Sequence, residues 1–302
     1  MVSLQKVINS ALSLWLVSAL AQRLSPRLGY RIGDFAAEQI ARRRNSSLVR
    51  AMRANQWVVH GECLDRDALD QVIRGTFRYA ARWIFDLYHY INNPTAIKEL
   101  IVLSPSFQGL ARRPTFDQEG LVIVGLHLSN FDLVLQWLCR EGLQPLILTI
   151  PDPQGARRME YERRRKAGMH LVPASVPALR QALHHLQRGG MVVTGIDRPL
   201  QAAKVRPRFF GRPAALPTHH IFLASKAHVP VVIAVTNLES DGKYHVYASE
   251  RIEMDVHPDA GVEALHNAEK VLRVAEKFIR QVPQQWSVPL PVWPEILELV
   301  PG

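Results

Sequence analysis

The sequence lacks the short motifs that mark several large enzyme classes. It contains no GxSxG nucleophile elbow, no GxxxxGK[ST] phosphate loop, no GxGxxG dinucleotide turn and no HExxH zinc pair. Internal repeats and low-complexity tracts are also absent. These absences argue against a serine hydrolase of the elbow type, a P-loop enzyme, a dinucleotide-dependent dehydrogenase and a solenoid.

Cysteine and acidic residues are scarce. Cys63 and Cys139 are the two cysteines, and no Cys/His spacing fits a zinc site, so we expect no disulfide framework, no metal and no cofactor. This fits a reducing, cytoplasmic setting. Asp and Glu total 27 against 37 Lys and Arg, which gives a net charge of +10. A basic surface suits nucleic acid, anionic lipid headgroups or an acidic carrier protein. Because no zinc-finger or RRM signature is present, we expect no nucleic-acid partner.

The N-terminal residues 4–24 have apolar side chains at helical spacing, interrupted by polar residues. Three alternatives remain open: a signal peptide ending near Ala21, a membrane-spanning helix, and a helix packed on the protein body. We favour a helix that lies in the bilayer interface. The predicted organisation is a membrane-anchoring helix in residues 1–30 and one domain in residues 31–302.

The most informative stretch runs from residue 121 to 138. Leu121 to Leu126 reads as a buried strand, His127 follows it, and Asp132 lies in the first turn of a helix. On one regular helix the His127 and Asp132 side chains would point about 140° apart, so they can meet only if His127 lies in the loop and the helix begins near Ser129. An imidazole held by a carboxylate is a general base with its orienting partner.

A purely structural interpretation of the same residues stays open. Ser129 followed by Asp132 resembles a capping box, with Asp in place of Glu or Gln. In that case Asp132 only satisfies the start of the helix, and His127 is a buried, hydrogen-bonded histidine.

The segment from His127 to Asp132 resembles the HX4D/E motif of glycerolipid and glycolipid acyltransferases. It is most similar to the H-x-x-N-W-E form of the bacterial lipid A biosynthesis acyltransferases, a family that also contains the phosphatidylinositol mannoside acyltransferase. Asn130 matches the family's Asn, whereas Phe131 and Asp132 replace Trp and Glu.

Later segments resemble the same family in order and spacing. Asp197 follows an apolar strand, a basic loop comes next, and the segment from Phe209 to Ala214 matches FFG-x-P-A. The segment from Pro283 to Trp286 is similar to the family's P-E-Q-W. Gln284 in place of Glu, and the absence of basic residues after Trp286, distinguish this chain from lipid A enzymes.

The resemblance implies a set of site residues. His127 and Asp132 are the predicted catalytic pair. The predicted substrate-binding residues are Asn130, Arg164, Arg165, Asp197, Arg198, Arg208, Phe210 and Gly211. The alternatives for the arginines are a charged exposed helix, and for Asp197 a turn-forming residue.

We therefore expect a single α/β domain with a largely parallel sheet flanked by helices, of the glycerolipid-acyltransferase type. The predicted enzyme is an O-acyltransferase at the cytoplasmic face of the cell (inner) membrane, where anionic lipids are its surface partner. It would move a fatty acyl group from acyl-CoA or acyl-carrier protein to a lipid or glycolipid hydroxyl. A thioesterase using the same pair and a non-catalytic basic peripheral membrane protein are the alternatives.

Overall fold

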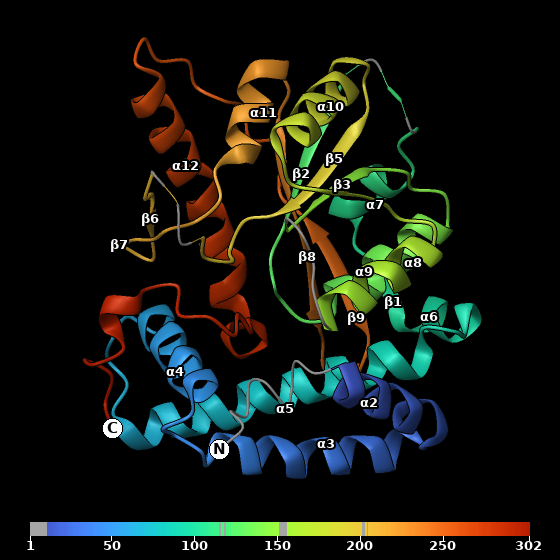
Figure 1. Ribbon diagram of the computed structural model, residues 1–302, viewed down its shortest axis with the longest axis vertical. Helices are drawn as coiled ribbons and strands as arrows, with labels where there is room; N and C mark the ends of the chain where they lie inside the picture. The colour runs from blue at the N-terminus through green and yellow to red at the C-terminus, as the bar shows by residue number, and fades with distance from the viewer. Residues whose placement is uncertain (1–10, 115, 118, 151–155, 201–202, 204) are drawn as a thin grey trace.

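The structure is a computed structural model that describes residues 11–302 except residues 115, 118, 151–155, 201–202 and 204 (Figure 1). A seven-stranded sheet stands above a layer of long N-terminal helices. The sheet contains β1 (Ile101–Leu103), β2 (Leu121–Gly125), β3 (Leu146–Thr149), β4 (His170–Pro173), β5 (Met191–Gly195), β8 (Val231–Leu238) and β9 (Tyr244–Ala248). A separate hairpin pairs β6 (Arg208–Phe209) with β7 (Arg212–Pro213).

The helices of the described residues surround the sheet. They are α2 (Ala11–Arg23), α3 (Pro26–Ala41), α4 (Ser47–Val59), α5 (Arg66–Tyr90), α6 (Pro94–Leu100), α7 (Pro105–Ala111), α8 (Phe131–Arg140), α9 (Ala156–Lys166), α10 (Val176–Gln187), α11 (His219–Ala227) and α12 (Ala260–Gln281), with short 3-10 turns η1 (Pro283–Gln285) and η2 (Pro294–Ile296). α5 is an amphipathic helix, with Leu69, Val72 and Ile73 among the residues of its buried face.

The strand order is β1-β9-β8-β2-β5-β3-β4. Every pair in this sheet is parallel except β8 with β9. Parallel strands need crossover connections, and helices such as α8 and α10 supply them. The predicted α/β domain with a largely parallel sheet is confirmed.

Strand β2 lies between two hydrophobic cores, one on each face of the sheet. Val122 and Val124 belong to the core that α10, α11 and α12 cover. Leu121 and Ile123 belong to the opposite core, which α5 and α8 cover. This alternation follows from the two-residue period of a strand, and it explains why β2 is an uninterrupted apolar run. The end of β2 is therefore fixed from both faces of the sheet.

Helices α2 and α3 pack on α5 at the lower edge of the molecule (Figure 1). Ala21 of α2 is buried, and its carbonyl oxygen accepts a hydrogen bond from His89 Nδ1 at 2.6 Å. Within the described residues, no helix has both the length and the hydropathy to span a membrane. Residues 4–10 of the predicted anchoring helix lie outside the described residues.

Candidate active site

The register between β2 and β5 brings two predicted site residues together. Gly125 of β2 pairs with Gly195 of β5 in a parallel ladder. His127 and Asp197 each follow their glycine by two residues, so they leave the sheet at the same level on neighbouring strands. The carboxyl edge of a parallel sheet is where α/β proteins gather functional side chains.

The Asp197 carboxylate accepts three N–H groups. His127 Nδ1 lies 2.7 Å from Oδ1, the His127 backbone N–H donates to Oδ2 at 2.7 Å, and Trp286 Nε1 donates to Oδ2 at 2.8 Å. Burial alone would raise the pKa of Asp197. The charge and hydrogen bonds of His127, together with the Trp286 donor, outweigh burial and hold this pKa below its ordinary value. Asp197 is therefore an ionised, acceptor-only group.

This carboxylate fixes the tautomer of His127. Because ionised Asp197 can only accept, Nδ1 of a neutral His127 carries the proton and Nε2 carries the lone pair. Nε2 makes no hydrogen bond with any described residue. The ring of Phe131 packs edge-on against the imidazole, with the ring centroids 5.3 Å apart. The result is an oriented imidazole whose basic nitrogen is available to a substrate.

The segment after α12 closes the site from another direction. The Ser129 backbone N–H donates to the Gln285 carbonyl oxygen at 3.0 Å, and the Ser287 N–H donates to the His127 carbonyl oxygen at 3.1 Å. The Gln285 side chain exchanges two hydrogen bonds of 2.8 Å with the backbone of Leu238 in β8. These bonds fix Trp286, which is fully buried, beneath Asp197.

The contact predicted between His127 and Asp132 is not the one formed. Asp132 is buried on α8, where it pairs with Arg164 Nε at 2.8 Å and with Arg163 Nη2 at 3.0 Å. Burial raises the pKa of Asp132, but the two guanidinium groups outweigh burial and leave it lower than usual. Asp197 takes the place at the imidazole because the β2–β5 register brings it there, whereas the first turn of α8 directs Asp132 toward α9.

The start of α8 also differs from the capping-box interpretation. The N-cap is Asn130, whose side chain accepts from the Leu133 N–H, and the helix begins at Phe131. Ser129 lies one residue earlier with φ of 49°, in the left-handed region. Asn130 Nδ2 also donates to the Trp83 carbonyl oxygen at 3.2 Å. Asn130 therefore joins α8 to α5 and is buried, and its predicted contact with substrate stays a prediction.

The other predicted substrate-binding residues lie on α9, directly after Asp197, and in the β6–β7 hairpin. Arg164 reaches the site through Asp132, whereas the exposed Arg165 points to Glu162, 3.8 Å away on its own helix. Arg208 is exposed on β6, and Arg198 directly follows Asp197. In the turn of the β6–β7 hairpin, Phe210 and Gly211 have φ of 50° and 78°. Phe210 lies against Trp286, with ring centroids 6.5 Å apart.

Two residues of this neighbourhood were not assigned from the sequence. Trp286 was noted only as part of a motif, and its link to Asp197 depends on contacts between distant segments. Arg163 was not selected with Arg164 and Arg165, because the arginines that face Asp132 are determined by the packing of α9 on α8. Tyr88 and Glu160 join Arg163, since Glu160 bonds both of the others.

An apolar cavity of about 290 Å³ lies beside the site, between α10, α11 and the segment before α11. His219 forms part of its wall and bonds Thr194 Oγ1 through Nε2 at 2.7 Å. Burial lowers the pKa of His219 to about 4, so this ring is neutral at pH 7. Thr194 precedes Gly195, and a side chain at Gly195 would approach His127 Cε1 to 3.8 Å. His219 in the cavity wall is therefore linked to the His127 imidazole through two neighbouring residues of β5, Thr194 and Gly195.

No group of His, Cys, Asp and Glu within the described part of the chain has an arrangement that fits a metal ion. The site is thus described by its protein groups: an imidazole, two buried carboxylates and the arginines of α9.

A family model described as bacterial lipid A biosynthesis acyltransferase matches residues 7–293 of the 302 residues. The match includes His127, Asp132, Asp197 and Trp286. No curated protein sequence matches the chain. Because the family model covers almost the whole length, the chain belongs to the bacterial lipid A biosynthesis acyltransferase family, whose members are acyltransferases.

Proposed function

We propose that the protein transfers a fatty acyl group from a thioester to a hydroxyl of a glycolipid or lipid A-type acceptor, with His127 as general base and Asp197 as its orienting partner. The observation that carries this proposal is the 2.7 Å contact between His127 Nδ1 and Asp197, which leaves Nε2 basic and free. The donor is acyl-CoA or acyl-carrier protein.

The reaction needs no covalent acyl-enzyme. His127 Nε2 removes the proton of the acceptor hydroxyl while the oxygen attacks the thioester carbonyl carbon. The tetrahedral intermediate then collapses, the C–S bond breaks, and the departing thiolate takes the proton from the imidazolium. Asp197 stabilises the imidazolium between these two steps, as the carboxylate of a hydrolytic triad does.

Asp132 has a different role in this proposal. It anchors Arg163 and Arg164 of α9 to the first turn of α8. Arg164 uses Nε for this bond, and its two terminal nitrogens make no hydrogen bond with a described residue. A guanidinium held by one nitrogen and open at two others suits a phosphate of the donor or acceptor. Asp132 is thus a positioning residue.

The apolar cavity supports an acyl-chain site. It is lined mainly by aliphatic and aromatic side chains, including Leu179, Leu216 and Phe222, and its wall at His219 adjoins β5 next to His127. A neutral His219 adds no charge to this surface. An alkyl chain in this cavity would place its carboxyl end near the base.

The acceptor is a lipid, so the reaction takes place at a membrane. Family members are membrane-associated in bacteria. We propose that this chain works at the cytoplasmic face of the inner membrane, where acyl-CoA and acyl-carrier protein are available and where anionic lipids attract its net charge of +10.

The test is acyl transfer by purified wild type and His127→Ala with labelled palmitoyl thioesters of CoA and of carrier protein, each with a bacterial membrane lipid extract. A labelled lipid made by wild type, and reduced about 10³-fold or more in His127→Ala, is the expected result. Release of free fatty acid without a lipid product would instead establish a thioesterase. Equal product from both proteins would overturn the role of His127.

A further inference from the structure

Among the described residues, helix α3 packs against the rest of the protein along one side. Its small residues Gly29, Gly33 and Ala37 recur every four positions and face α5. The approach is close: a Cβ at Gly29 would lie 2.1 Å from the Phe85 ring, and one at Gly33 would lie 3.3 Å from Ala81 Cβ. This seam determines which side of α3 faces outward.

The outward side of α3 is apolar. Leu28, Ile32 and Phe35 lie on it at spacings of four and three residues, and they are 47%, 49% and 68% exposed. Helix α2 adds Trp15, at 58%. Sixteen large hydrophobic side chains are exposed among the described residues, and seven of them lie between residues 15 and 35. Exposed apolar residues therefore concentrate on these two helices, a pattern that marks an interaction surface.

Arginines border this apolar stripe. Arg27 and Arg31 are exposed on α3 beside Leu28 and Ile32. Arg42 follows Phe35 by two helical turns, about 10 Å along the axis, on the same side. These arginines and the exposed Asp34 lie along one edge of the stripe. An apolar stripe bordered mainly by cationic side chains is typical of a helix that lies in a bilayer interface, because arginines can extend their charged ends to the headgroups.

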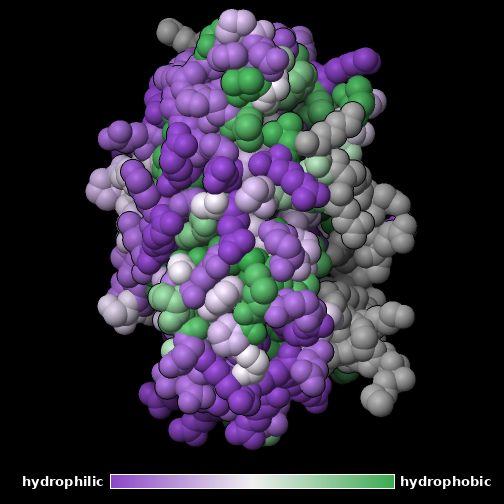
Figure 2. All heavy atoms as spheres, turned by 90° about the vertical axis from the view of Figure 1, so that its left-hand side faces the viewer, coloured by the Kyte–Doolittle hydropathy of each residue, from purple (hydrophilic) through white to green (hydrophobic). Residues whose placement is uncertain are grey.

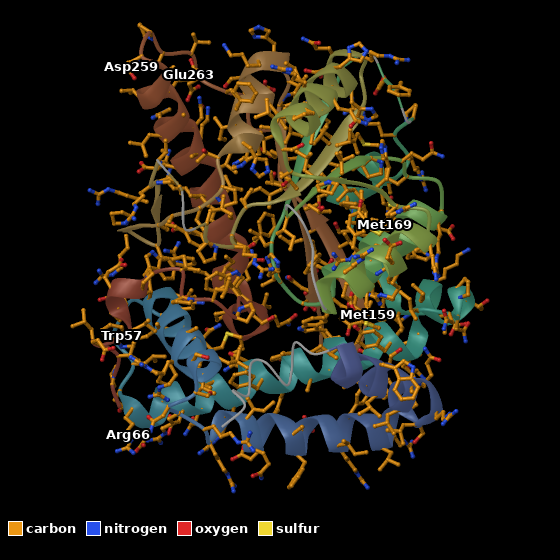
Figure 3. The ribbon with its side chains drawn as sticks, in the orientation of Figure 1. Trp57, Arg66, Met159, Met169, Asp259 and Glu263 are labelled. Carbon is orange, nitrogen blue, oxygen red and sulfur yellow. The ribbon has the colours of Figure 1, made fainter. Side chains whose placement is uncertain are left out.

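A pocket of about 370 Å³ opens where α3 ends and α5 begins. Its charged lining residues are Arg42, Arg44, Arg66, Arg74 and Asp70. Figure 3 labels Arg66 at the lower corner of the molecule, beyond the end of α3. The space-filling view in Figure 2 has hydrophilic residues over the lower end of the molecule, where α3, α4 and α5 meet.

The arginines of this pocket are not fully neutralised. Asp70 bonds both Arg44 and the buried Arg53, while Glu38 lies 3.2 Å from Arg42 and 3.4 Å from Arg74. Five guanidinium groups (the four lining the pocket and Arg53) against two carboxylates leave a net charge of +3. Arg66 makes no hydrogen bond or ion pair with a described residue. Guanidinium groups around a concavity are suited to bind a phosphate.

From these observations we propose that α3 docks the protein on an anionic phospholipid bilayer, with Leu28, Ile32 and Phe35 among the acyl chains and a lipid phosphate in the pocket of Arg42, Arg44, Arg66 and Arg74. The inference deepens the proposed function, since it names the membrane partner and the surface that meets it. It does not depend on the chemistry of His127, so the two can fail separately.

The test is sedimentation of the purified full-length protein with vesicles of phosphatidylcholine alone and vesicles that also contain phosphatidylglycerol. Arg42→Gln/Arg66→Gln should weaken binding to the anionic vesicles about tenfold or more. The matched control is Arg180→Gln/Arg273→Gln, which removes the same charge from exposed positions on α10 and α12. A surface away from the bilayer is screened by salt, so this control should change binding less than about twofold.

A second pair of variants tests the apolar stripe. Ile32→Gln/Phe35→Gln should weaken binding to both kinds of vesicle, whereas Val256→Gln/Val262→Gln, also at exposed positions, should leave it unchanged. Equal losses in each variant and its control would overturn the docking surface. His127→Ala should bind vesicles as wild type does, whatever its activity.

A soluble anion is the competing occupant of the pocket. Inorganic phosphate without vesicles, followed by thermal unfolding, separates the two sources. If Arg42→Gln/Arg66→Gln loses a stabilisation by phosphate but keeps wild-type vesicle binding, the pocket serves a soluble phosphate and the membrane assignment is overturned.

Discussion

The buried carboxylates of Asp197 and Asp132 follow neighbouring strands, β5 and β2, but they contact different groups. Asp197 meets an imidazole, a backbone N–H and an indole N–H, whereas Asp132 meets two guanidinium groups. Both have a lowered pKa, so both are ionised at pH 7. The groups that they contact therefore distinguish them, since their charge is the same. An imidazole can accept and return a proton near pH 7, and a guanidinium cannot.

This difference is the reason that we propose Asp197 as the partner that orients a base and Asp132 as a residue that holds two elements together. Asp132 ties α8 to α9, because its partners Arg163 and Arg164 lie on α9. Replacing each aspartate by asparagine should separate the two roles, because the change removes charge at nearly constant volume.

The largest effect on activity in this comparison is expected for Asp197→Asn. An amide at this position can present its NH₂ group to His127 and favour the unproductive tautomer, so kcat/KM should fall about 10³-fold or more. Steady-state kinetics with a thioester donor measures this. A loss smaller than for Asp132→Asn would reverse the roles that we assign.

Asp132→Asn should mainly reduce stability. It removes the buried counter-charge of Arg164 and leaves Glu160 as the carboxylate partner of Arg163. Removal of one partner of a buried ion pair costs about 3 kcal/mol or more. Urea unfolding followed by circular dichroism measures the free energy of unfolding. An unchanged free energy together with lost activity would indicate that Asp132 acts directly in the reaction.

The pH dependence of this loss follows from the pKa of Asp132. A carboxyl whose pKa is lower in the folded state contributes its full stability above its unfolded pKa of about 3.9, and loses it as the pH falls through the folded value. The difference in unfolding free energy between wild type and Asp132→Asn should therefore be constant from neutral pH down to about 4 and shrink below it.

Trp286→Phe should have a smaller effect, about tenfold on kcat/KM, because it removes one of the three donors to Asp197. The loss of this donor raises the pKa of Asp197, so the acid limb of the pH–rate profile should move to higher pH. Trp293→Phe is the matched control, since Trp293 packs with Phe209 and Trp286 in one aromatic cluster while its Nε1 has no hydrogen-bond partner among the described residues. A similar shift in both variants would mean that ring packing alone is responsible.

The smallest effect is expected for Arg165→Gln. Among the described residues the charged partner of this exposed arginine is Glu162 of its own helix, so activity should stay within about twofold of wild type and the free energy of unfolding within about 1 kcal/mol. A large loss of activity measured with the same thioester assay would place Arg165 at the substrate and would make the contacts of α9 a poor guide to its function.

Local patterns predicted most elements of the fold. The apolar run at residues 121–126 corresponds to β2, which ends one residue earlier, and the apolar strand expected before Asp197 corresponds to β5. The same local reasoning selected His127, because it follows the central strand, and its catalytic role stays a prediction. The contact predicted between His127 and Asp132 was wrong, since Asp132 is near in sequence whereas Asp197 is near only through the strand register.

The residues that local patterns missed depend on the packing of distant segments. Trp286 reaches Asp197 only because Gln285 is bonded to β8 and Ser287 to the backbone of His127. The choice among Arg163, Arg164 and Arg165 depends on how α9 rotates against α8, which no spacing within α9 reveals. By contrast, the small-residue seam of α3 is visible in sequence as Gly29, Gly33 and Ala37, although its partner α5 is not.

The bonds between residues 127–129 and the segment after α12 also bear on the biosynthesis of the protein. All strands of the sheet leave the ribosome before Trp286 does, so a nascent chain can form β2 and β5 while Asp197 still lacks its indole donor. A chain released shortly before Pro283 would carry the histidine and its aspartate without the bonds that hold them. Prematurely terminated chains should therefore have no acyltransferase activity.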